Sequence, residues 1–497
     1  MQTPAVSNNI SSEKSYNLQD WQGGYKSLNQ EFDYWIDDIE GEIPLELQGT
    51  FFKNGPGLFD INGQRIYHPF DGDGMISRIT FTNGRAHFRN RFVHTAEYLA
   101  EQKAGKILYR GVFGTQKPGG WLANIFDLKV KEIANTNVIY WGGKLLALWE
   151  ASLPYRLEAD TLKTLGKENF NSVLTAKEAF SAHPRIDPSY QQDGKPRLVN
   201  FFVQPGTSTK ITVVELSLAG EIVSKKVYSV SGFCFIHDFV ITPNYCIFFQ
   251  NPVKFNPLPY ILGFSGAGQC IKLQPNQPTK IIVIPRTSEN NSSELKILET
   301  KAGFIFHHAN AYEVDEEIIV DSIFYERLTE VKGSNEDYLQ TDFDANAPGQ
   351  LRRFYLNLTE NTVKTDLLDS RAYEFPVIHP NYVGRQHRYI YSAAVHTETG
   401  NAPLQAIAKF DLQSQQSLIW SAAPRGFVGE PVFVPRPNSP AEDDGWLLTL
   451  VYDAAHHRSD VVILNAQDLQ LVAKLHLKHH IPYGLHGSFT PEIFVNS

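Results

Sequence analysis

The chain has 497 residues, of which 42% are hydrophobic and 20% charged, with a mean hydropathy of -0.28. These values are typical of a globular chain and not of a disordered one, and no apolar run approaches the ~20 residues needed to cross a bilayer. The formal net charge of -9 and the pI near 6.0 argue against a nucleic-acid partner, because binding to phosphate backbones requires clustered Lys and Arg.

The N-terminal residues, 1–20, are polar and rich in Ser and Asn, and we expect them to form a flexible arm. Residues 21–497 carry strand patterns without an evident linker, which predicts a single domain. The chain start has neither the apolar stretch of a secretory signal nor the Arg-rich character of a transit peptide, and its three cysteines lie among apolar residues. Both features predict a cytoplasmic location.

The first clear element is a β-hairpin. Residues 75–93 alternate apolar and polar side chains around Asn83-Gly84, the pair that favours a type I′ turn. Similar strand segments recur: KLLALWE (144–150), PRLVNFFV (196–203), YCIFFQN (245–251), EIIVDSI (317–323), RYIYSAA (388–394) and WLLTLVYD (446–453). Their starts are roughly 50 to 70 residues apart, close to one four-stranded propeller blade of ~40–50 residues plus loops. The repeat predicts an all-β, seven-bladed β-propeller, since stacked β-sandwiches would show linkers.

Helical patterns are scarce, and the best candidate is GGWLANIFDLKVKEIANTN (119–137). Its apolar residues cluster in the first half and its lysines follow. Two interpretations remain open: an interfacial helix that contacts a membrane, or a cap packed on the propeller.

Four of the sixteen histidines stand out by their position in the repeat. His183, His237 and His307 each precede the central strand of their own unit, on the strand that would lie nearest the axis. His486 follows the last unit, where the chain must return to close the ring. Equivalent positions of different blades converge at the centre of a propeller. A single histidine is more often a hydrogen-bonded core residue, but the recurrence favours a shared metal site.

For one of these residues, His237, the local alternation predicts which side chains lie on the same face. If the segment around His237 is a strand, Phe235, His237 and Phe239 share one face. For the adjacent pair His307-His308, periodicity does not choose which side chain faces the axis.

Eight motifs extend from about Gly49 to Phe489: NGPG (54–57), HPFDGDGM (68–75), NTN (135–137), SAHPR (181–185), FIHDF (235–239), FHHANAYE (306–313), GEPVFVPR (429–436) and HGSF (486–489). Together they resemble the carotenoid cleavage oxygenases and, within that family, the cyanobacterial apocarotenoid 15,15′-oxygenases. The resemblance implies a propeller with a loop and helix dome over an axial iron, one Fe(2+) per chain. The implied iron ligands are His183, His237, His307 and His486, which leaves His308 to an outer or packing role.

The resemblance also implies residues around the ligands. Three glutamates, Glu150, Glu374 and Glu430, would tether ligand imidazoles, because a ligating histidine needs its other N–H bonded to a carboxylate or carbonyl. Thr136 would project toward one vacant position on the iron. Four neutral imidazoles leave octahedral iron(II) up to two open positions for O2, whereas tetrahedral zinc with four ligands is closed.

The implied substrate is an apolar polyene aldehyde, cleaved with O2 at its 15,15′ double bond to give retinal and a second aldehyde. The tunnel residues carried over from the family are Phe70, Phe113, Trp149, Phe235 and Phe306, each of which could instead be ordinary core. Because a polyene partitions into lipid, we expect peripheral contact with a membrane.

Alternatives remain on the same scaffold. A stilbene-cleaving dioxygenase of the lignostilbene type would need a Tyr and Lys near the substrate phenol, a pair that the sequence does not place. An isomerase or hydrolase would not consume O2, and a carotenoid-binding protein would not turn over its ligand.

Overall fold

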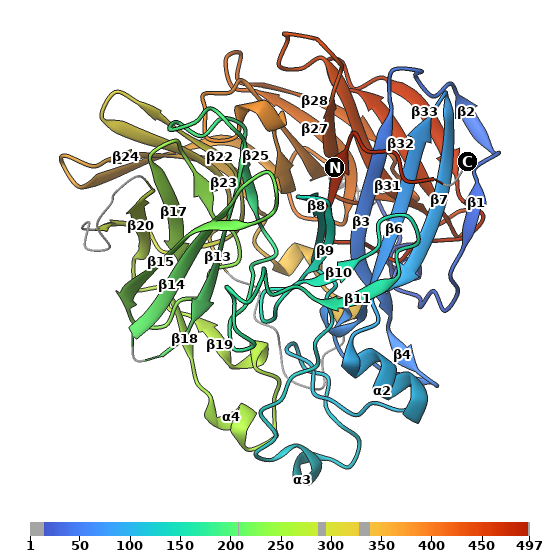
Figure 1. Cartoon of the computed structure of the whole chain (residues 1–497), viewed down its shortest axis with the longest axis horizontal. Helices are drawn as coiled ribbons and strands as arrows, with labels where there is room; N and C mark the ends of the chain where they lie inside the picture. The colour runs from blue at the N-terminus through green and yellow to red at the C-terminus, as the bar shows by residue number, and fades with distance from the viewer. Residues whose placement is uncertain (1–13, 207, 287–294, 328–337, 496–497) are drawn as a thin grey trace, which may run out of the picture.

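The computed structural model describes residues 14–206, 208–286, 295–327 and 338–495 (Figure 1). Regular structure in this part of the chain is mostly β, and the strands pair antiparallel throughout their sheets. The predicted all-β class is therefore confirmed.

Three sheets come from the first half of the chain and from its C-terminal end. The first has the order β1 (Asp33–Trp35), β7 (Arg85–Phe92), β6 (Asp73–Thr82), β3 (Gly49–Leu58), β34 (Gly487–Thr490). The second is β11 (Thr164–Lys167), β10 (Tyr155–Leu157), β9 (Lys144–Leu148), β8 (Asn137–Trp141). The third is β12 (Arg185–Asp187), β13 (Arg197–Gln204), β14 (Ser208–Leu216), β15 (Ile222–Ser231). The C-terminal strand thus completes the sheet that the N-terminal strands begin.

Three further sheets follow. The fourth is β16 (Val240–Ile241), β17 (Tyr245–Gln250), β20 (Thr279–Pro285), β21 (Lys296–Thr300). The fifth is β22 (Phe304–Val314), β23 (Glu317–Tyr325), β24 (Gln350–Asn357), β25 (Thr362–Val377), β26 (Tyr389–Val395), β27 (Leu404–Asp411), β28 (Gln416–Ser421). The sixth is β2 (Ile39–Gly41), β33 (Leu471–His476), β32 (Arg458–Asn465), β31 (Gly445–Asp453), β29 (Gly426–Val428), with β30 (Val432–Pro435) also on β31. Two short ribbons pair β4 (Asp60–Ile61) with β5 (Gln64–Arg65) and β18 (Val253–Phe255) with β19 (Ile271–Leu273).

The predicted strands are confirmed. The hairpin is β6–β7, and its turn residues Asn83 and Gly84 have positive φ values of 51° and 70°, as a type I′ turn requires. The six later segments form β9, β13, β17, β23, β26 and β31. Each of these strands has a partner on both sides, which explains its long apolar run.

Seven apolar clusters fill the spaces between successive sheets. Phe201 of the third sheet packs with Phe248 of the fourth, and Ile247 of the fourth shares a cluster with Val320 of β23. The fifth sheet behaves as two halves, because β25 pairs with β24 through its first part and with β26 through its last part. A further cluster joins the sixth sheet to the first. The core is therefore a series of interfaces between neighbouring sheets.

Helices are short in the described residues. They are α1 (Leu18–Gly23), α2 (Ala96–Ala104), α3 (Trp121–Asn124), α4 (Leu258–Ile261) and the 3-10 turns η1 (Pro69–Asp71), η2 (Gly268–Cys270), η3 (Tyr338–Gln340), η4 (Phe343–Ala345), η5 (Pro380–Tyr382). Among them, none is long and apolar enough to span a bilayer. Of the expected arm, residues 1–13 lie outside the described residues; the remainder, 14–20, contacts the body, since Tyr16 packs on Phe343.

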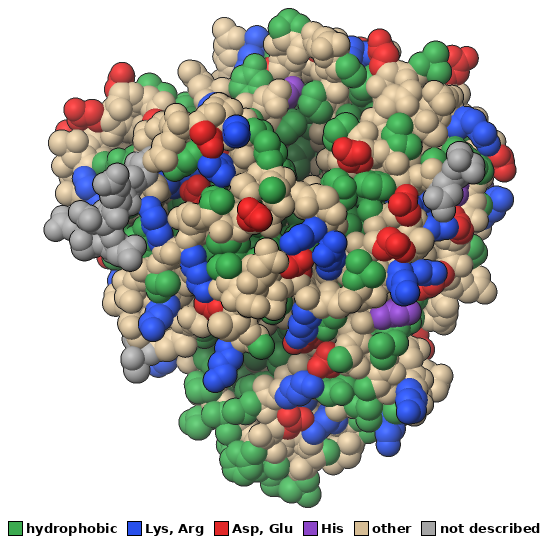
Figure 2. All heavy atoms as spheres, in the orientation of Figure 1, with side chains coloured by type: hydrophobic (Ala, Val, Ile, Leu, Met, Phe, Trp, Pro, Cys, Tyr) green, Lys and Arg blue, Asp and Glu red, His purple; other side chains and the backbone are tan. Residues whose placement is uncertain are grey.

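The predicted helix over 119–137 is wrong. Only the single turn α3 forms, because Gly119 and Gly120 precede it with positive φ and Ile125, in an extended conformation, ends it. The second half of the segment enters the core, where Ile133 and Ala134 are buried. The apolar side chains of its first half are largely exposed at the lower end of the molecule, where α3 and α4 lie below the sheets (Figures 1 and 2).

We call this end the apolar tip. Its exposed apolar residues are Trp121, Leu122, Phe126, Leu128, Leu258, Leu262 and Phe264.

Candidate metal centre

The four singled-out histidines come together in the structure. His183, His237, His307 and His486 each offer one ring nitrogen, and these nitrogens all lie within 4.8 Å of one another. The Nε2 atoms of His183 and His237 are 2.9 Å apart. With metal–nitrogen bonds of about 2.1 Å, two ligands at right angles lie about 3.0 Å apart. One cation therefore fits between them.

Each histidine sits at the beginning of an edge strand of a different sheet. His183, His237 and His486 come one to three residues before β12, β16 and β34, and only His307 lies inside its strand, β22. Of the three histidines predicted to lie on strands, His183, His237 and His307, only His307 does so. The residues before the other strands are irregular, so the four imidazoles reach one point from four strand ends.

The predicted shared face of Phe235, His237 and Phe239 is wrong. Residues 233–239 form no strand, so their side chains do not alternate. Phe239 packs in the core on Phe201, Phe235 contacts Phe304, and His237 faces the other histidines.

For the pair that periodicity left open, the structure selects His307. A bulge in the pairing of β22 with β23 lies between Ile305 and His308, and such an extra residue redirects side chains. His308 turns away from the centre, and its Nδ1 lies 2.6 Å from Ser322 Oγ.

Burial favours the neutral, nitrogen-donating form of two of the four imidazoles, His183 and His486. Burial, reinforced by the neighbouring histidines, lowers the pKa of His183 well below its ordinary value, and burial also lowers the pKa of His486. For His307, burial is outweighed by Glu374, which raises its pKa. The Nε2 of His307 is buried without a hydrogen-bond partner, a rare condition that a metal ligand would explain.

Three of the four rings are tethered through Nδ1 by the predicted glutamates. Glu150 lies 2.8 Å from His237, Glu374 2.5 Å from His307 and Glu430 2.7 Å from His486. A carboxylate on Nδ1 holds the proton there and leaves Nε2 free for a cation. The tautomer and the ring orientation are thus fixed together.

The glutamates have partners of their own. Lys53 Nζ lies 2.8 Å from Glu430 Oε2; although burial opposes ionisation, Lys53 and His486 lower the pKa of Glu430 to about 2. Tyr325 donates to Glu374 at 2.6 Å. Sequence reasoning missed Lys53, yet a lysine inside the fully buried strand β3 is a signal, because a buried charge needs a partner.

Thr136 lies beside the histidines. Its carbonyl accepts the His486 backbone N–H at 3.0 Å, and its hydroxyl donates to Glu150 Oε2 at 3.4 Å. The Asn54 side chain holds the same loop by donating to the carbonyls of Ala134 and Asn137.

The predicted tunnel residues fall into separate groups. Phe306 packs edge-on against His237 with ring centroids 5.8 Å apart, and it joins Phe235 through Phe304. Phe375, which sequence reasoning missed although it follows Glu374, contacts both His307 and His486. These half-buried rings form an apolar wall at the centre.

The second group comes from η1 and from the loop between α2 and α3. Phe70 and Phe113 pack on each other and on His68, and Tyr338 adds a fourth ring. Asp71 fixes this group, because its carboxylate accepts the backbone N–H of Phe113 at 2.9 Å. Trp149 belongs to neither group: it is buried and bridges to Phe180.

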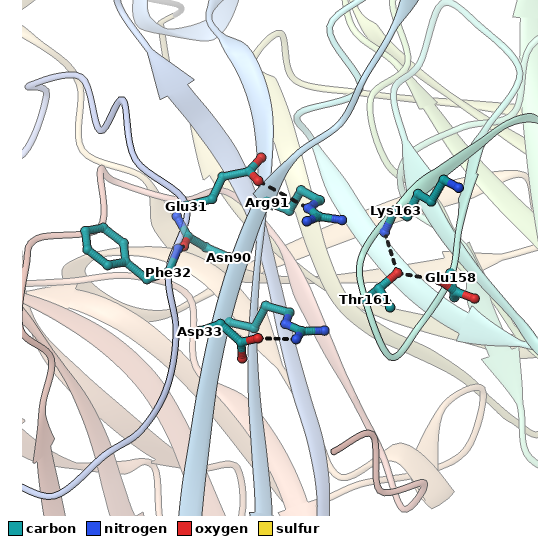
Figure 3. Close-up of a pocket in the computed structure, with 9 residues that line it drawn as sticks. Glu31, Phe32, Asp33, Asn90, Arg91, Glu158, Thr161 and Lys163 are labelled. Carbon is teal, nitrogen blue, oxygen red and sulfur yellow. Dashed lines mark hydrogen bonds and ion pairs between the residues drawn. The ribbon is translucent and has the colours of Figure 1, made fainter. Parts of the chain in front are cut away.

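A surface cleft elsewhere is lined mainly by charged and polar residues, several of which pair with one another. It is lined by β1, β7 and the turn between β10 and β11 (Figure 3). Arg91 pairs with Glu31 at 3.2 Å, and Arg89 pairs with Asp33. No histidine of the centre lines it.

Known proteins are similar to this chain over nearly its whole length. A family model described as RPE65, retinal pigment epithelial membrane protein, matches residues 25–491. The chain is 52% identical to the apocarotenoid-15,15′-oxygenase of Synechocystis sp., over 96% of this chain and 97% of that protein. It is 30% identical to a carotenoid 9,10(9′,10′)-cleavage dioxygenase of Crocus sativus, over 91% and 85%.

The fold agrees as well. A crystal structure of cobalt-substituted Synechocystis ACO superposes with a TM-score of 0.94 at 51% identity, covering 96% of this chain and 100% of that one. The chain therefore belongs to the RPE65 family of carotenoid oxygenases and is an oxygenase of the carotenoid-cleaving type.

Proposed function

We propose that this protein is an iron(II)-dependent oxygenase that cleaves the 15,15′ double bond of an apocarotenal, yielding retinal and a second aldehyde. The observation that carries the proposal is the set of four converging imidazoles, three of them tethered by glutamates. The 52% identity to an apocarotenoid-15,15′-oxygenase supports the position of cleavage. The alkene carbons each gain one oxygen atom of O2, so both oxygens end in the two aldehydes.

Iron is the metal that best fits this donor set. His183, His237, His307 and His486 supply four neutral nitrogens, and imidazole suits zinc, copper, iron and nickel. Iron(II), when bound, supplies the redox chemistry that activates O2. A substrate oxygenase needs open coordination positions, which four tetrahedral ligands on zinc would not leave. A related crystal structure is of cobalt-substituted Synechocystis ACO, which is consistent with a site that accepts several divalent ions.

The protein's own groups position the reactants. Thr136 lies where its side chain can restrict one approach to the centre. Phe235, Phe306 and Phe375 present apolar surface at the histidines, and Phe70 and Phe113 do so farther out. A polyene held along these rings would place one double bond at the centre, so the depth of binding would select the bond.

The seven-bladed propeller is part of this proposal. The seven apolar clusters link the sheets in one series. Three clusters join the first sheet to the second, the second to the third and the third to the fourth. Two more join the fourth sheet to the β22–β25 half of the fifth, and the two halves of the fifth to each other. The last two join the β25–β28 half to the sixth sheet, and the sixth sheet to the first. Such a series returns to its start after seven interfaces. A ring of seven blades with the histidines at its axis accounts for it.

We also propose that the apolar tip contacts a membrane surface, from the cytoplasmic side. Leu122 and Phe126 are 69% and 71% exposed, which is unusual for a water-facing loop. We call Phe70, Phe113, His68 and Tyr338 the outer aromatic group. The chain that follows the tip residue Phe264 reaches this group, because Gly268 donates its N–H to Val112 O at 2.7 Å, next to Phe113. A polyene leaving the lipid would enter there.

The test is incubation of the iron-loaded protein with a panel of apocarotenals of different lengths, followed by mass analysis of the products. We expect retinal from all-trans β-apocarotenals. Cleavage of a phenolic stilbene with no retinal from any apocarotenal would replace the proposal with the stilbene-cleaving alternative. A change of double-bond geometry without O2 consumption would point to an isomerase.

A further inference from the structure

Behind the histidines, one ion pair joins three of the four metal-facing segments. Arg185, two residues after His183, places Nη2 2.5 Å from Oδ2 of Asp238, which directly follows His237. The same Asp238 oxygen accepts the backbone N–H of His308 at 2.9 Å, next to His307. The pair therefore lies between the segments of three sheets.

The guanidinium completes the connection. Arg185 Nη2 also donates to the His308 carbonyl at 2.9 Å, and its Nε donates to the Phe239 carbonyl at 2.8 Å. A planar, five-donor group can satisfy several acceptors in fixed directions at once, which an ammonium cannot do.

The location explains why side chains are needed here. His183 and His237 lie outside regular strands, and the bulge at His307 interrupts the β22–β23 ladder. Backbone pairing alone therefore does not fix these three segments. Both backbone groups of His308 bond to the Arg185–Asp238 pair.

The fourth segment is held separately. Asn54 N–H donates to the His486 carbonyl at 2.9 Å, and Lys53 binds Glu430 and the Leu485 carbonyl. None of these contacts involves Arg185 or Asp238.

We propose that Arg185 and Asp238 are positioning residues that set the relative placement of the His183, His237 and His307 imidazoles, and so tune metal affinity and coordination geometry. This inference rests on the proposed metal function. It predicts that weakening the pair distorts three ligands together while the His486 side stays in place.

The test compares Asp238→Asn with Asp321→Asn. Asn at 238 can still accept the His308 N–H but loses the charge that holds Arg185. Asp321 is the matched control, because it is also buried and its side chain pairs with Arg353 at 2.8 and 2.9 Å and with His387, not with the side chains or backbone of the His183, His237 or His307 segments. The readouts are cobalt(II) affinity and the visible ligand-field spectrum of the cobalt form, with the melting temperature of the metal-free protein as a measure of folding.

We expect Asp238→Asn to lower cobalt(II) affinity about 10–100-fold, the usual effect of an outer contact, and to change the spectrum. Asp321→Asn should alter neither. If Asp238→Asn does not fold, Arg185→Lys carries the same test, since it keeps the charge but loses the fork. Wild-type affinity and spectrum in the folded variant would overturn the positioning role alone. Failure of the wild-type protein to bind iron or cobalt would overturn the proposed function instead.

Discussion

The metal centre and the apolar tip are both built on irregular backbone, but they are held in opposite ways. At the centre, buried carboxylates orient the functional rings directly, as Glu430 does for His486. At the tip the apolar side chains are exposed, and the contacts that fix this region are made mainly to the backbone beneath them. The difference is the one expected if the centre binds a cation, which needs oriented side chains, and if the tip contacts an apolar surface, as we propose, which needs exposed ones.

One residue fixes the base of the tip. The fully buried guanidinium of Arg110 donates to the carbonyls of Asn124 and Asp127 beside α3, and to those of Tyr260 and Ser265 beside α4. Arg110 binds carbonyl oxygens at both loops and stacks on the Tyr260 ring, so it joins the loops without using the exposed apolar side chains of the tip. The apolar side chains consequently point outward.

The largest effect should come from removing an imidazole at the centre. His183→Ala, His237→Ala, His307→Ala and His486→Ala should each abolish activity and lower iron content from about one per chain. His308→Ala, which removes an adjacent ring that faces Ser322, should keep its iron. Elemental analysis with an activity assay measures both, and full iron in any of the first four variants would remove that residue from the site.

Loss of a tether should cost less than loss of a ring. Glu150→Gln, Glu374→Gln and Glu430→Gln keep an acceptor but lose the charge, so activity or metal affinity should fall about 10–100-fold. Titration with iron(II) and steady-state kinetics would report it. Wild-type behaviour in all three variants would mean that these carboxylates do not orient the ligands.

The sequence predicts the residues of the site that belong to local motifs, but not those that pair over long sequence separations. The four histidines and three glutamates were predictable because motifs carry them at fixed places. Lys53 lies 377 positions from Glu430, and no local spacing announces such a pairing. The same holds for Arg185 and Asp238, which lie 53 positions apart in the segments of two different sheets.

The fold shows the same limit. Inner strands were predictable because both their faces are buried, whereas segment 119–137 has apolar spacing that resembles a helix although apolar residues of its first half, such as Leu122 and Phe126, are exposed. Gly120, with positive φ, precedes the turn, and Ile125, in an extended conformation, ends it after four residues. The irregular approach to His237 likewise broke the expected alternation, because no neighbouring strand pairs with it there.

Arg110→Met tests the base of the tip. It leaves several buried carbonyls without a donor, at about 1–3 kcal/mol each, so the loops of α3 and α4 should loosen. We expect a lower melting temperature, faster proteolysis in 117–128 or 258–265, and weaker liposome binding, with iron content unchanged. Equal loss of iron would show that the two regions are not independent.

Changing the tip's surface should leave the fold intact. Trp121→Glu, Leu122→Glu and Phe126→Glu together should weaken flotation with liposomes, because charged side chains do not enter the interface. The matched control is Leu218→Glu, Val223→Glu and Val227→Glu, a set of similarly exposed apolar residues on the sheet side. If both sets float equally, the tip is not a membrane contact.

The smallest effect should come from the outer aromatic group. Phe113→Leu widens the space beside Phe70 and His68 and leaves the four histidines of the metal centre unchanged. The rate or the position of cleavage should shift, with a change in specificity of about 5-fold, or about 1 kcal/mol, the low end of the range for an altered apolar contact, while iron content stays constant. Product chromatography with chain-length variants of the substrate would detect the shift.

The most direct test of the central claim is cleavage of an all-trans β-apocarotenal under isotopically labelled O2, with the His486→Ala variant in parallel. The account predicts retinal and a second aldehyde from the wild-type protein, each with one labelled oxygen in rapidly quenched samples, and no products from the variant. Absence of label from both aldehydes, or equal product from the variant, would contradict an oxygenase centred on these histidines.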